Sequence, residues 1–168
     1  KSFVDRKVRS PKNNVLAPAA REETQVEWDD VVRECSDAAD GAFMATVGAD
    51  GRPHVAWVGV GFDGDRVWTA TDRPSQKAKN LQAGSDVALH WPEDPKRLIF
   101  MRATARMVED DDEVRRCWDS GVLPYEPTTF WSGPDDERLL FVELVPQTAS
   151  VWRGDITRPP DRWRRSGV

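Results

Sequence analysis

The sequence has few of the residues that commonly hold metals or form disulfide bonds. Only two of its 168 residues are cysteines and only two are histidines. Cys35 and Cys117 lie too far apart for a C-x-x-C pair, and His54 and His90 add no closely spaced ligands. We therefore expect no zinc cluster and no metal-centred chemistry.

Long apolar stretches are also missing. No segment approaches the roughly 20 consecutive apolar residues that span a bilayer, and the chain does not open with a charged and then apolar leader. We expect a cytoplasmic protein that does not enter a membrane.

An excess of positive charge is missing as well. The formal net charge is −5, which argues against nonspecific nucleic-acid binding, because that binding needs a basic surface that releases counterions. Residues 1–20 nevertheless have five Lys or Arg and one acid, and residues 152–168 have five Arg and two acids. The two ends are thus basic around an acidic body.

The length allows one domain with a real core but not two. Residues 1–22 show no sustained hydrophobic period, so we expect a basic arm there, either disordered or laid on a partner. A single domain is expected over residues 23–168.

Three helices are expected. The pattern Thr-Gln-Val-Glu over residues 24–27 predicts a capping box, and apolar residues at helical spacing follow it, from Trp28 through Cys35. A cysteine on such an apolar face is more often a buried, inert thiol than a reactive one. Two shorter helices are expected over residues 75–83 and 111–120, each followed by a glycine.

Most of the remaining pattern is typical of strands. Turns at Asp50-Gly51 and Asp63-Gly64 predict that the first three strands form a meander. Antiparallel strands with few, short helices indicate a mainly β (α+β) barrel rather than a parallel α/β sheet. The expected strands are Ala42–Val47, Pro53–Val60, Arg66–Thr71, Val87–Trp91, Leu98–Val108, Leu139–Val145 and Ala149–Arg153.

Residues 59–64 match the dinucleotide-binding pattern G-x-G-x-x-G. That pattern needs a helix to begin there, whereas these glycines lie between two expected strands. We favour the interpretation that Gly59 and Gly61 leave a strand without side chains where another part of the protein approaches its backbone closely. Gly64 would form a turn.

Residues 69–81 carry the strongest chemical signal. A strand ends near Thr71, a turn follows, and Ser75 is placed to cap a helix that contains Lys77 and Lys79. Backbone N–H groups and positive charge at such a junction suit an anion, most naturally a phosphate. A surface helix with solvated lysines explains the same pattern, so both interpretations stay open.

With these motifs in view, the chain resembles the flavin-binding split-barrel superfamily. This group includes the pyridoxamine 5'-phosphate oxidases, the general-stress flavin proteins and the deazaflavin-dependent reductases. The resemblance covers roughly residues 25–165. It rests on Ala42–Val47, Asp50–His54, Trp68–Thr71, Ser75-x-Lys77-x-x-Asn80-Leu81, Val87–Leu89, Leu98–Val108, Ser150–Gly154 and Arg158–Arg162.

The resemblance implies a split β-barrel of antiparallel strands with a few short flanking helices, which binds FMN at a homodimer interface. Arg158 matches a residue that contacts substrate in the oxidases. The implied cofactor-binding residues are Val55, Ala56, Trp57, Val58, Ala70, Thr71, Ser75, Gln76, Lys77, Arg97, Trp152 and Arg162. With eight tryptophans in the chain, Trp57 and Trp152 are the two expected nearest the flavin.

Departures from the vitamin-pathway oxidases argue against vitamin B6 synthesis. Those oxidases have an Arg and a Lys on the flavin-facing strand where this chain has Val55 and Val60, and a histidine where it has Pro160. The missing Lys and His are expected to bind pyridoxal-type phosphates. The N-terminal half is at least as similar to the general-stress and deazaflavin groups.

The leading hypothesis is an FMN-dependent oxidoreductase acting on a small molecule. Flavin carries out the electron transfer itself, which suits a chain without an evident nucleophile or acid–base pair. The aromatic loop over residues 121–137 would be a substrate wall or lid, or would pack against a partner subunit. Two alternatives remain: a reductase using the deazaflavin F420, and a noncatalytic flavin or haem binder with His54 or His90 as axial ligand.

Overall fold

The computed structural model describes residues 24–94, 97–155 and 157–167; the expected arm over residues 1–22 lies outside them. The helices are α1 (Trp28–Ala38), α2 (Gln76–Gln82) and α3 (Asp111–Ser120), with a 3-10 turn at Pro127–Thr129. The strands are β1 (Gly41–Val47), β2 (Pro53–Gly59), β3 (Gly61–Asp63), β4 (Arg66–Asp72), β5 (Val87–Asp94), β6 (Arg97–Met107), β7 (Leu139–Arg153) and β8 (Asp161–Arg164).

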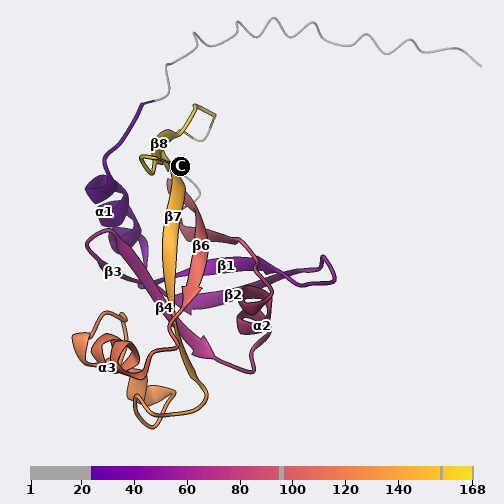
Figure 1. Ribbon diagram of the computed structural model, residues 1–168. Coiled ribbons are helices and arrows are strands. Elements are labelled where there is room, and N and C mark those ends of the chain that lie inside the picture. The colour runs from indigo at the N-terminus through magenta and orange to yellow at the C-terminus, as the bar shows by residue number, and fades with distance from the viewer. Residues whose placement is uncertain (1–23, 95–96, 156, 168) are drawn as a thin grey trace, which may run out of the picture.

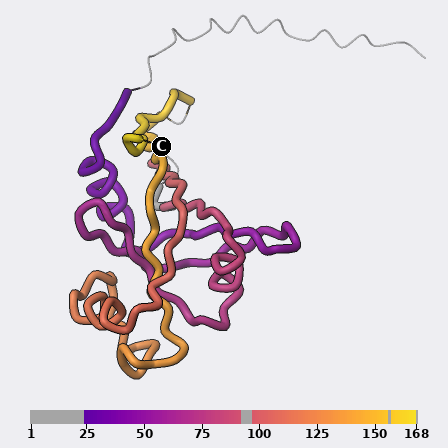
Figure 2. The backbone as a smooth tube through the Cα atoms, viewed as in Figure 1, coloured from indigo at the N-terminus to yellow at the C-terminus, as the bar shows by residue number. Residues whose placement is uncertain are grey.

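The strands form one antiparallel sheet. Its order is β2-β1-β5-β6-β7-β4-β3, with β8 added beside β7. The sheet curls into a half-barrel, and the three short helices lie around it (Figure 1). The path of the chain shows the β1–β2 hairpin extending away from the body, with α2 beside it (Figure 2). The predicted fold class, a split barrel of antiparallel strands with short flanking helices, is confirmed.

The predicted meander of the first three strands is wrong. β2 pairs with β1 at one end of the sheet order, whereas β4 pairs with β3 and β7 near the other end. Val60 lies between β2 and β3, where the chain passes from one end of the sheet order to the other. Its N–H donates to the Asp40 carbonyl oxygen over 3.1 Å. A two-residue turn is a local signal, but the choice of strand partner depends on distant residues.

The expected start of the first helix is also wrong. The N-cap residue is Glu27, and no side chain caps the helix. Thr24 and Val26 instead form backbone hydrogen bonds with Arg162 of β8, 2.9 and 3.0 Å long. Pairing with β8 keeps this segment extended, so the helix begins only at Trp28. The helix over residues 111–120 has the predicted bounds, and Gly121 ends it with φ +65°.

The two strands predicted over residues 139–145 and 149–153 form one continuous strand, β7. Its register against β6 shifts between Arg102 and Ala103, so the interruption is a bulge rather than a loop. β8 was not predicted, because its sequence Asp-Arg-Trp-Arg lacks apolar alternation.

The buried side chains form two clusters on opposite faces of β7. Because successive strand residues alternate, Leu140 and Val142 face the larger cluster while Leu139 and Phe141 face the smaller one. The larger cluster includes Cys35 of α1, as predicted, and burial raises the pKa of its thiol well above the ordinary value. The smaller cluster lies beneath α3 and the loop that follows it.

An ion-pair network ties α1 to the sheet. The Glu34 carboxylate accepts hydrogen bonds from Nε of Arg97 (2.8 Å) and Nε of Arg153 (2.6 Å). Arg153 also pairs with Asp161 of β8. Burial alone would raise the pKa of Glu34, but the hydrogen bonds and charges of the two arginines outweigh it and hold the pKa below 4.5.

We expect Glu34→Gln to lower the free energy of unfolding at neutral pH by about 1–3 kcal/mol, because charge-assisted hydrogen bonds are weakened. The pKa of Glu34 is lower in the folded chain, so its contribution is complete above the ordinary value of 4.5 and lost as pH falls through the folded value. Urea denaturation at neutral and acidic pH measures the free energy of unfolding of wild type and variant.

The difference between wild type and variant should therefore shrink in acid. Asp112→Asn, at an exposed residue of α3, is the matched control. Equal losses in the two variants, or a Glu34→Gln loss that grows in acid, would contradict the assigned network.

Candidate functional site

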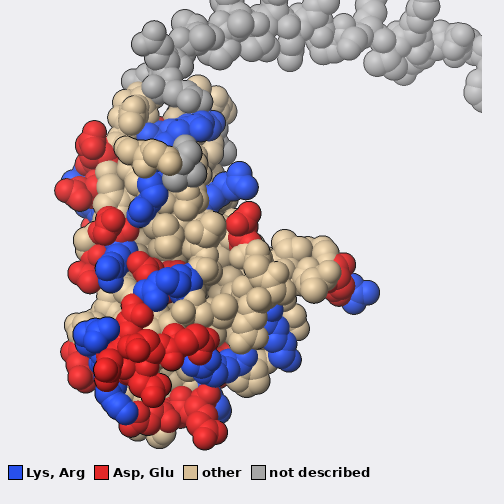
Figure 3. Space-filling view, viewed as in Figure 1, with Lys and Arg blue, Asp and Glu red and all other residues tan. Residues whose placement is uncertain are grey.

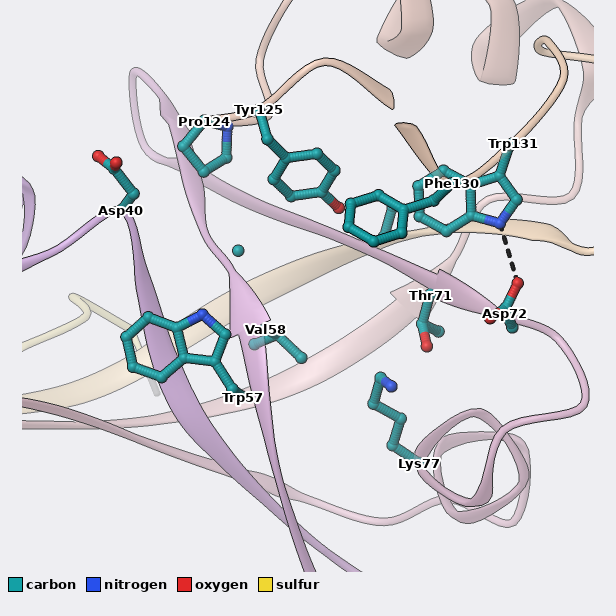
Figure 4. A pocket seen from close by; sticks show the side chains of 12 residues that line it. Asp40, Trp57, Val58, Thr71, Asp72, Lys77, Pro124, Tyr125, Phe130 and Trp131 are labelled. Atoms are coloured by element: carbon teal, nitrogen blue, oxygen red, sulfur yellow. Dashed lines mark hydrogen bonds between the residues drawn. The ribbon is translucent and has the colours of Figure 1, made fainter. Parts of the chain in front are cut away.

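A pocket of about 420 Å³ opens between β2, β4, α2 and the loop after α3. Its volume lies within the range of small-molecule sites. Figure 4 shows aromatic rings on two sides of it and Lys77 reaching in from α2. The lining residues are Asp40, Trp57, Val58, Gly59, Ala70, Thr71, Asp72, Lys77, Pro124, Tyr125, Phe130 and Trp131.

One side of the pocket is polar and carries charges of both signs. Lys77 lies there beside Thr71 and Asp72. Burial lowers the pKa of Lys77, while the Asp72 charge opposes that shift. The Ser75 hydroxyl caps α2 by accepting from the Ala78 N–H (3.3 Å), as predicted, and lies 3.1 Å from the Thr71 hydroxyl. A cation, a carboxylate and a hydroxyl thus line the cavity from adjoining elements.

The opposite side is an aromatic wall, which we define as Pro124, Tyr125, Phe130 and Trp131. Phe130 contacts both of its aromatic neighbours, with ring centroids 5.4 Å from Tyr125 and 5.6 Å from Trp131. The Trp131 indole is buried in the smaller core cluster, and its N–H donates to Asp72 over 3.0 Å. The loop predicted as a possible substrate wall therefore does line the pocket.

Three glycines at or near the pocket are approached closely by other parts of the chain, and one of them, Gly59, lines it. Gly41 of β1 lies directly opposite Gly59 of β2. A Cβ on Gly41 would lie 2.9 Å from the six-membered ring of Trp57, and one on Gly59 only 2.3 Å from the Tyr125 ring. Gly61 is closer still to the loop, since its Cβ would lie 1.7 Å from the Val122 carbonyl oxygen. The predicted close approach at Gly59 and Gly61 is confirmed.

The structure brings five of the predicted cofactor residues to this pocket and places the others elsewhere. Val55 and Ala56 lie farther along β2, and Val55 is exposed. Gln76 donates to the Asn80 side chain over 2.8 Å. Ser75 does not line the pocket either, and its hydroxyl caps α2. The five that line the pocket are Trp57, Val58, Ala70, Thr71 and Lys77.

The remaining predicted residues do not line the pocket of their own chain. Arg97 is held by Glu34 and lies 3.8 Å from Asp37. The Trp152 N–H donates to the Arg158 carbonyl (3.0 Å), and the Arg158 side chain pairs with Asp155.

Arg162 lies in β8, where its backbone pairs with Thr24 and Val26. It lines a separate small cavity together with Gln25 and Arg164.

An aromatic band, defined here as Trp57, Phe43, His90, Phe100 and Trp152, crosses one face of the sheet. Its members lie on β2, β1, β5, β6 and β7, and register places the first four directly opposite one another. Three pairs of rings are in contact: Phe43 with Trp57 (centroids 5.3 Å apart), His90 with Phe100 (4.4 Å, stacked) and Phe100 with Trp152 (5.8 Å). Phe43, Trp57 and Phe100 are 43%, 50% and 42% exposed. Trp57 belongs both to this band and to the pocket.

Two features of the site were missed from the sequence. Asp40 lines the pocket from the turn before β1, and no local pattern marks it. The aromatic band depends on cross-strand register, although exposed aromatic residues on predicted strands, such as Trp57 and Phe43, offered a partial signal.

The structure is thus an antiparallel split barrel whose main pocket combines aromatic side chains with a lysine. The family model described as pyridoxamine 5'-phosphate oxidase matches residues 28–153. The chain belongs to this family. No curated protein matches the chain.

Several solved structures share the fold. A protein related to general stress protein 26 from Clostridium acetobutylicum has 14% identity, a TM-score of 0.65, and coverage of 83% of this chain and 96% of its own. General stress protein 26 from Bacillus anthracis has 15% identity, a TM-score of 0.60, and coverage of 79% and 97%. A heme binding protein from Mycobacterium smegmatis has 17% identity, a TM-score of 0.61, and coverage of 84% and 59%.

Two further observations concern the described residues alone. None of their helices has the length and apolar character needed to cross a membrane. They also contain no group of three or more His, Cys, Asp or Glu side chains suited to a metal ion.

We expect Gly61→Ala to destabilise the protein by about 1–3 kcal/mol, because the added Cβ would collide with backbone that cannot swing aside. Gly133→Ala is the control, since a Cβ there meets no atom within 4 Å. Urea denaturation followed by tryptophan fluorescence compares the two. Equal free energies of unfolding for the two variants would show that the loop after α3 does not pack closely against Gly61.

Proposed function

We propose that the protein is an FMN-dependent oxidoreductase that acts on a small molecule. The observation that carries this proposal is the pocket itself, where Lys77 and Thr71 face an aromatic wall across about 420 Å³. The donor set fits FMN: an ammonium and a hydroxyl suit its phosphate, and aromatic side chains suit its flat ring. Family membership supports the same assignment.

Each part of the pocket then has a defined task. Lys77 neutralises phosphate charge, and its partly buried position strengthens that interaction by excluding water. Trp57 and the aromatic wall would enclose the flavin ring, and the absence of a side chain at Gly59 lets the Tyr125 ring take its place in that wall. The flavin, when bound, supplies the electron transfer, so the chain needs groups that bind and orient rather than a nucleophile.

The proposal includes a homodimer. The aromatic band is exposed and continuous with the pocket through Trp57, which favours burial against a second copy. Trp152, Arg158 and Arg162 are remote from the pocket of their own chain, so in this arrangement they serve the pocket of the partner. FMN would then lie at the interface.

A second candidate, haem binding, is favoured by His90. Its Nδ1 lies 3.2 Å from the Ile99 carbonyl oxygen, which only accepts, so Nδ1 carries the proton in the neutral ring. Nε2 is left as a ligand atom on a half-buried ring that stacks on Phe100 within the aromatic band. In this case a porphyrin rather than a second copy covers the band.

We expect Lys77→Ala to weaken FMN binding about 10- to 100-fold, the loss typical of a charge-assisted contact. Quenching of flavin fluorescence on titration measures the affinity. Lys79→Ala is the matched control, since Lys79 is exposed on the same helix and does not line the pocket. If both variants bind FMN as tightly as wild type, the phosphate assignment fails.

Absorption spectra with FMN, F420 and haem separate the candidates. FMN binding followed by bleaching with NAD(P)H or another electron donor supports the oxidoreductase. A Soret band lost in His90→Ala supports the haem alternative, and binding of F420 alone supports a deazaflavin reductase. Flavin that binds but is neither reduced nor reoxidised would contradict an enzymatic role.

We expect Phe100→Arg to convert a dimer into a monomer, because it places a charge within the aromatic band. Size-exclusion chromatography with light scattering gives the mass. Gln82→Arg adds the same charge at an exposed residue of α2 and should leave the mass unchanged. A wild-type protein that is monomeric with FMN present would refute the dimer.

A further inference from the structure

A row of polar side chains connects α2 to β1. Asn80 is 2% exposed, and its Nδ2 donates to the hydroxyl of Thr46, which is 1% exposed, over 2.9 Å. The Oδ1 of Asn80 accepts from Nε2 of Gln76 over 2.8 Å. We call Thr46, Asn80 and Gln76 the polar clamp. Because the bond between Asn80 and Thr46 is buried, water cannot replace it, and losing the hydroxyl would leave an unpaired amide.

The polar clamp is one of three attachments of α2 to the sheet. The helix has only seven residues, so few contacts fix its position. At its start, the Ser75 hydroxyl lies 3.1 Å from the Thr71 hydroxyl of β4. Beyond its end, the Ser85 hydroxyl accepts from the Val47 N–H of β1 over 2.9 Å. Between these two contacts, the polar clamp attaches the body of the helix to β1.

The position of α2 determines where the Lys77 ammonium lies. Figure 4 shows Lys77 reaching into the pocket from α2. Trp57 and Val58, which also line the pocket, lie on β2, and β2 pairs with β1 along its whole length. The polar clamp therefore joins the helix that supplies the cation to the hairpin that supplies Trp57. A displacement of about 1 Å is enough to cost a binding group much of its effect.

We infer that Asn80 and Thr46 are positioning residues, which hold α2 against β1 so that Lys77 meets the anionic end of the ligand. That this end is the phosphate of FMN rests on the proposed function, whereas the attachment of α2 to β1 does not. Neither residue lines the pocket, so each acts through Lys77 rather than by touching the ligand. Gln76, which the resemblance implied as a cofactor contact, belongs to the polar clamp in this structure.

Thr46→Val keeps the shape of the side chain and removes the hydroxyl that Asn80 contacts. We expect FMN to bind about three- to tenfold more weakly, the range of one net hydrogen bond. Riboflavin, which lacks the phosphate, should bind as tightly as it does to wild type. Quenching of flavin fluorescence measures both affinities. Thr46→Ser retains the hydroxyl and should bind FMN as wild type does.

Thr69→Val is the matched control. Thr69 of β4 is buried, and its hydroxyl has no hydrogen-bond partner in the described part of the chain. The substitution makes the same chemical change in the core but breaks no bond, so FMN affinity should not change. A purely structural role for Thr46 would weaken FMN and riboflavin alike. That result, or unchanged FMN affinity in Thr46→Val, would overturn the inference.

A double variant asks whether the polar clamp acts through Lys77. In a Lys77→Ala background, Thr46→Val should change FMN affinity by less than about twofold, because the group that it positions is gone. Equal losses with and without Lys77 would refute a positioning role.

Hydrogen exchange of the α2 amides, measured without ligand, separates this inference from the proposed function. Thr46→Val should speed that exchange and Thr69→Val should not, because only the first loosens the helix. If exchange speeds up but wild type binds no FMN, the proposed function falls and the attachment of α2 stands. Unchanged exchange in Thr46→Val overturns the polar clamp, whether or not FMN binds through Lys77.

Discussion

The contact between the backbone at residues 59–61 and the loop after α3 determines the arrangement of the pocket. Neither Gly59 nor Gly61 has a Cβ, so Tyr125 and the Val122 carbonyl lie where side-chain atoms would otherwise be. The same short segment takes the chain from β2 to β3, at opposite ends of the sheet order. Between Gly59 and Gly61, the Val60 N–H donates a hydrogen bond to the Asp40 carbonyl oxygen. Closure of the half-barrel, the aromatic wall and the position of Asp40 thus depend on one close approach.

Local patterns in the sequence predicted most elements, and the errors came from nonlocal competition. Ser75 was identified as a cap because capping depends on the next three residues. The pattern at Thr24 was equally local, yet pairing with β8 overrode it. In the pocket, the positions of Thr71 and Lys77 were predicted from a strand–turn–helix pattern. Asp40 lines the same pocket as a loop more than eighty residues away, and no local pattern predicts that.

Charge and apolar surface lie on different parts of the molecule. Figure 3 shows acidic side chains gathered over α3 and the loop after it, and the first turn of α3 alone has three acids. Like charges there oppose self-association through α3. The aromatic band lies on strands β2, β1, β5, β6 and β7 and contains no acidic residue. Of these two surfaces, the band is the one that two copies can share without repulsion.

The aromatic wall is anchored at one end, and this favours a fixed wall over a lid. Trp131 is buried in the smaller core cluster and bonded to Asp72, so moving it would expose its indole and leave that bond unmade. Arg138 further holds the loop by donating to the Phe130 carbonyl (3.1 Å) and to Asp136. The Phe130 side chain, by contrast, is 57% exposed and belongs to neither buried cluster. Discrimination among ligands should therefore come from ring rotation at Phe130 and from the charges of Lys77 and Asp72, within a loop backbone that stays in place.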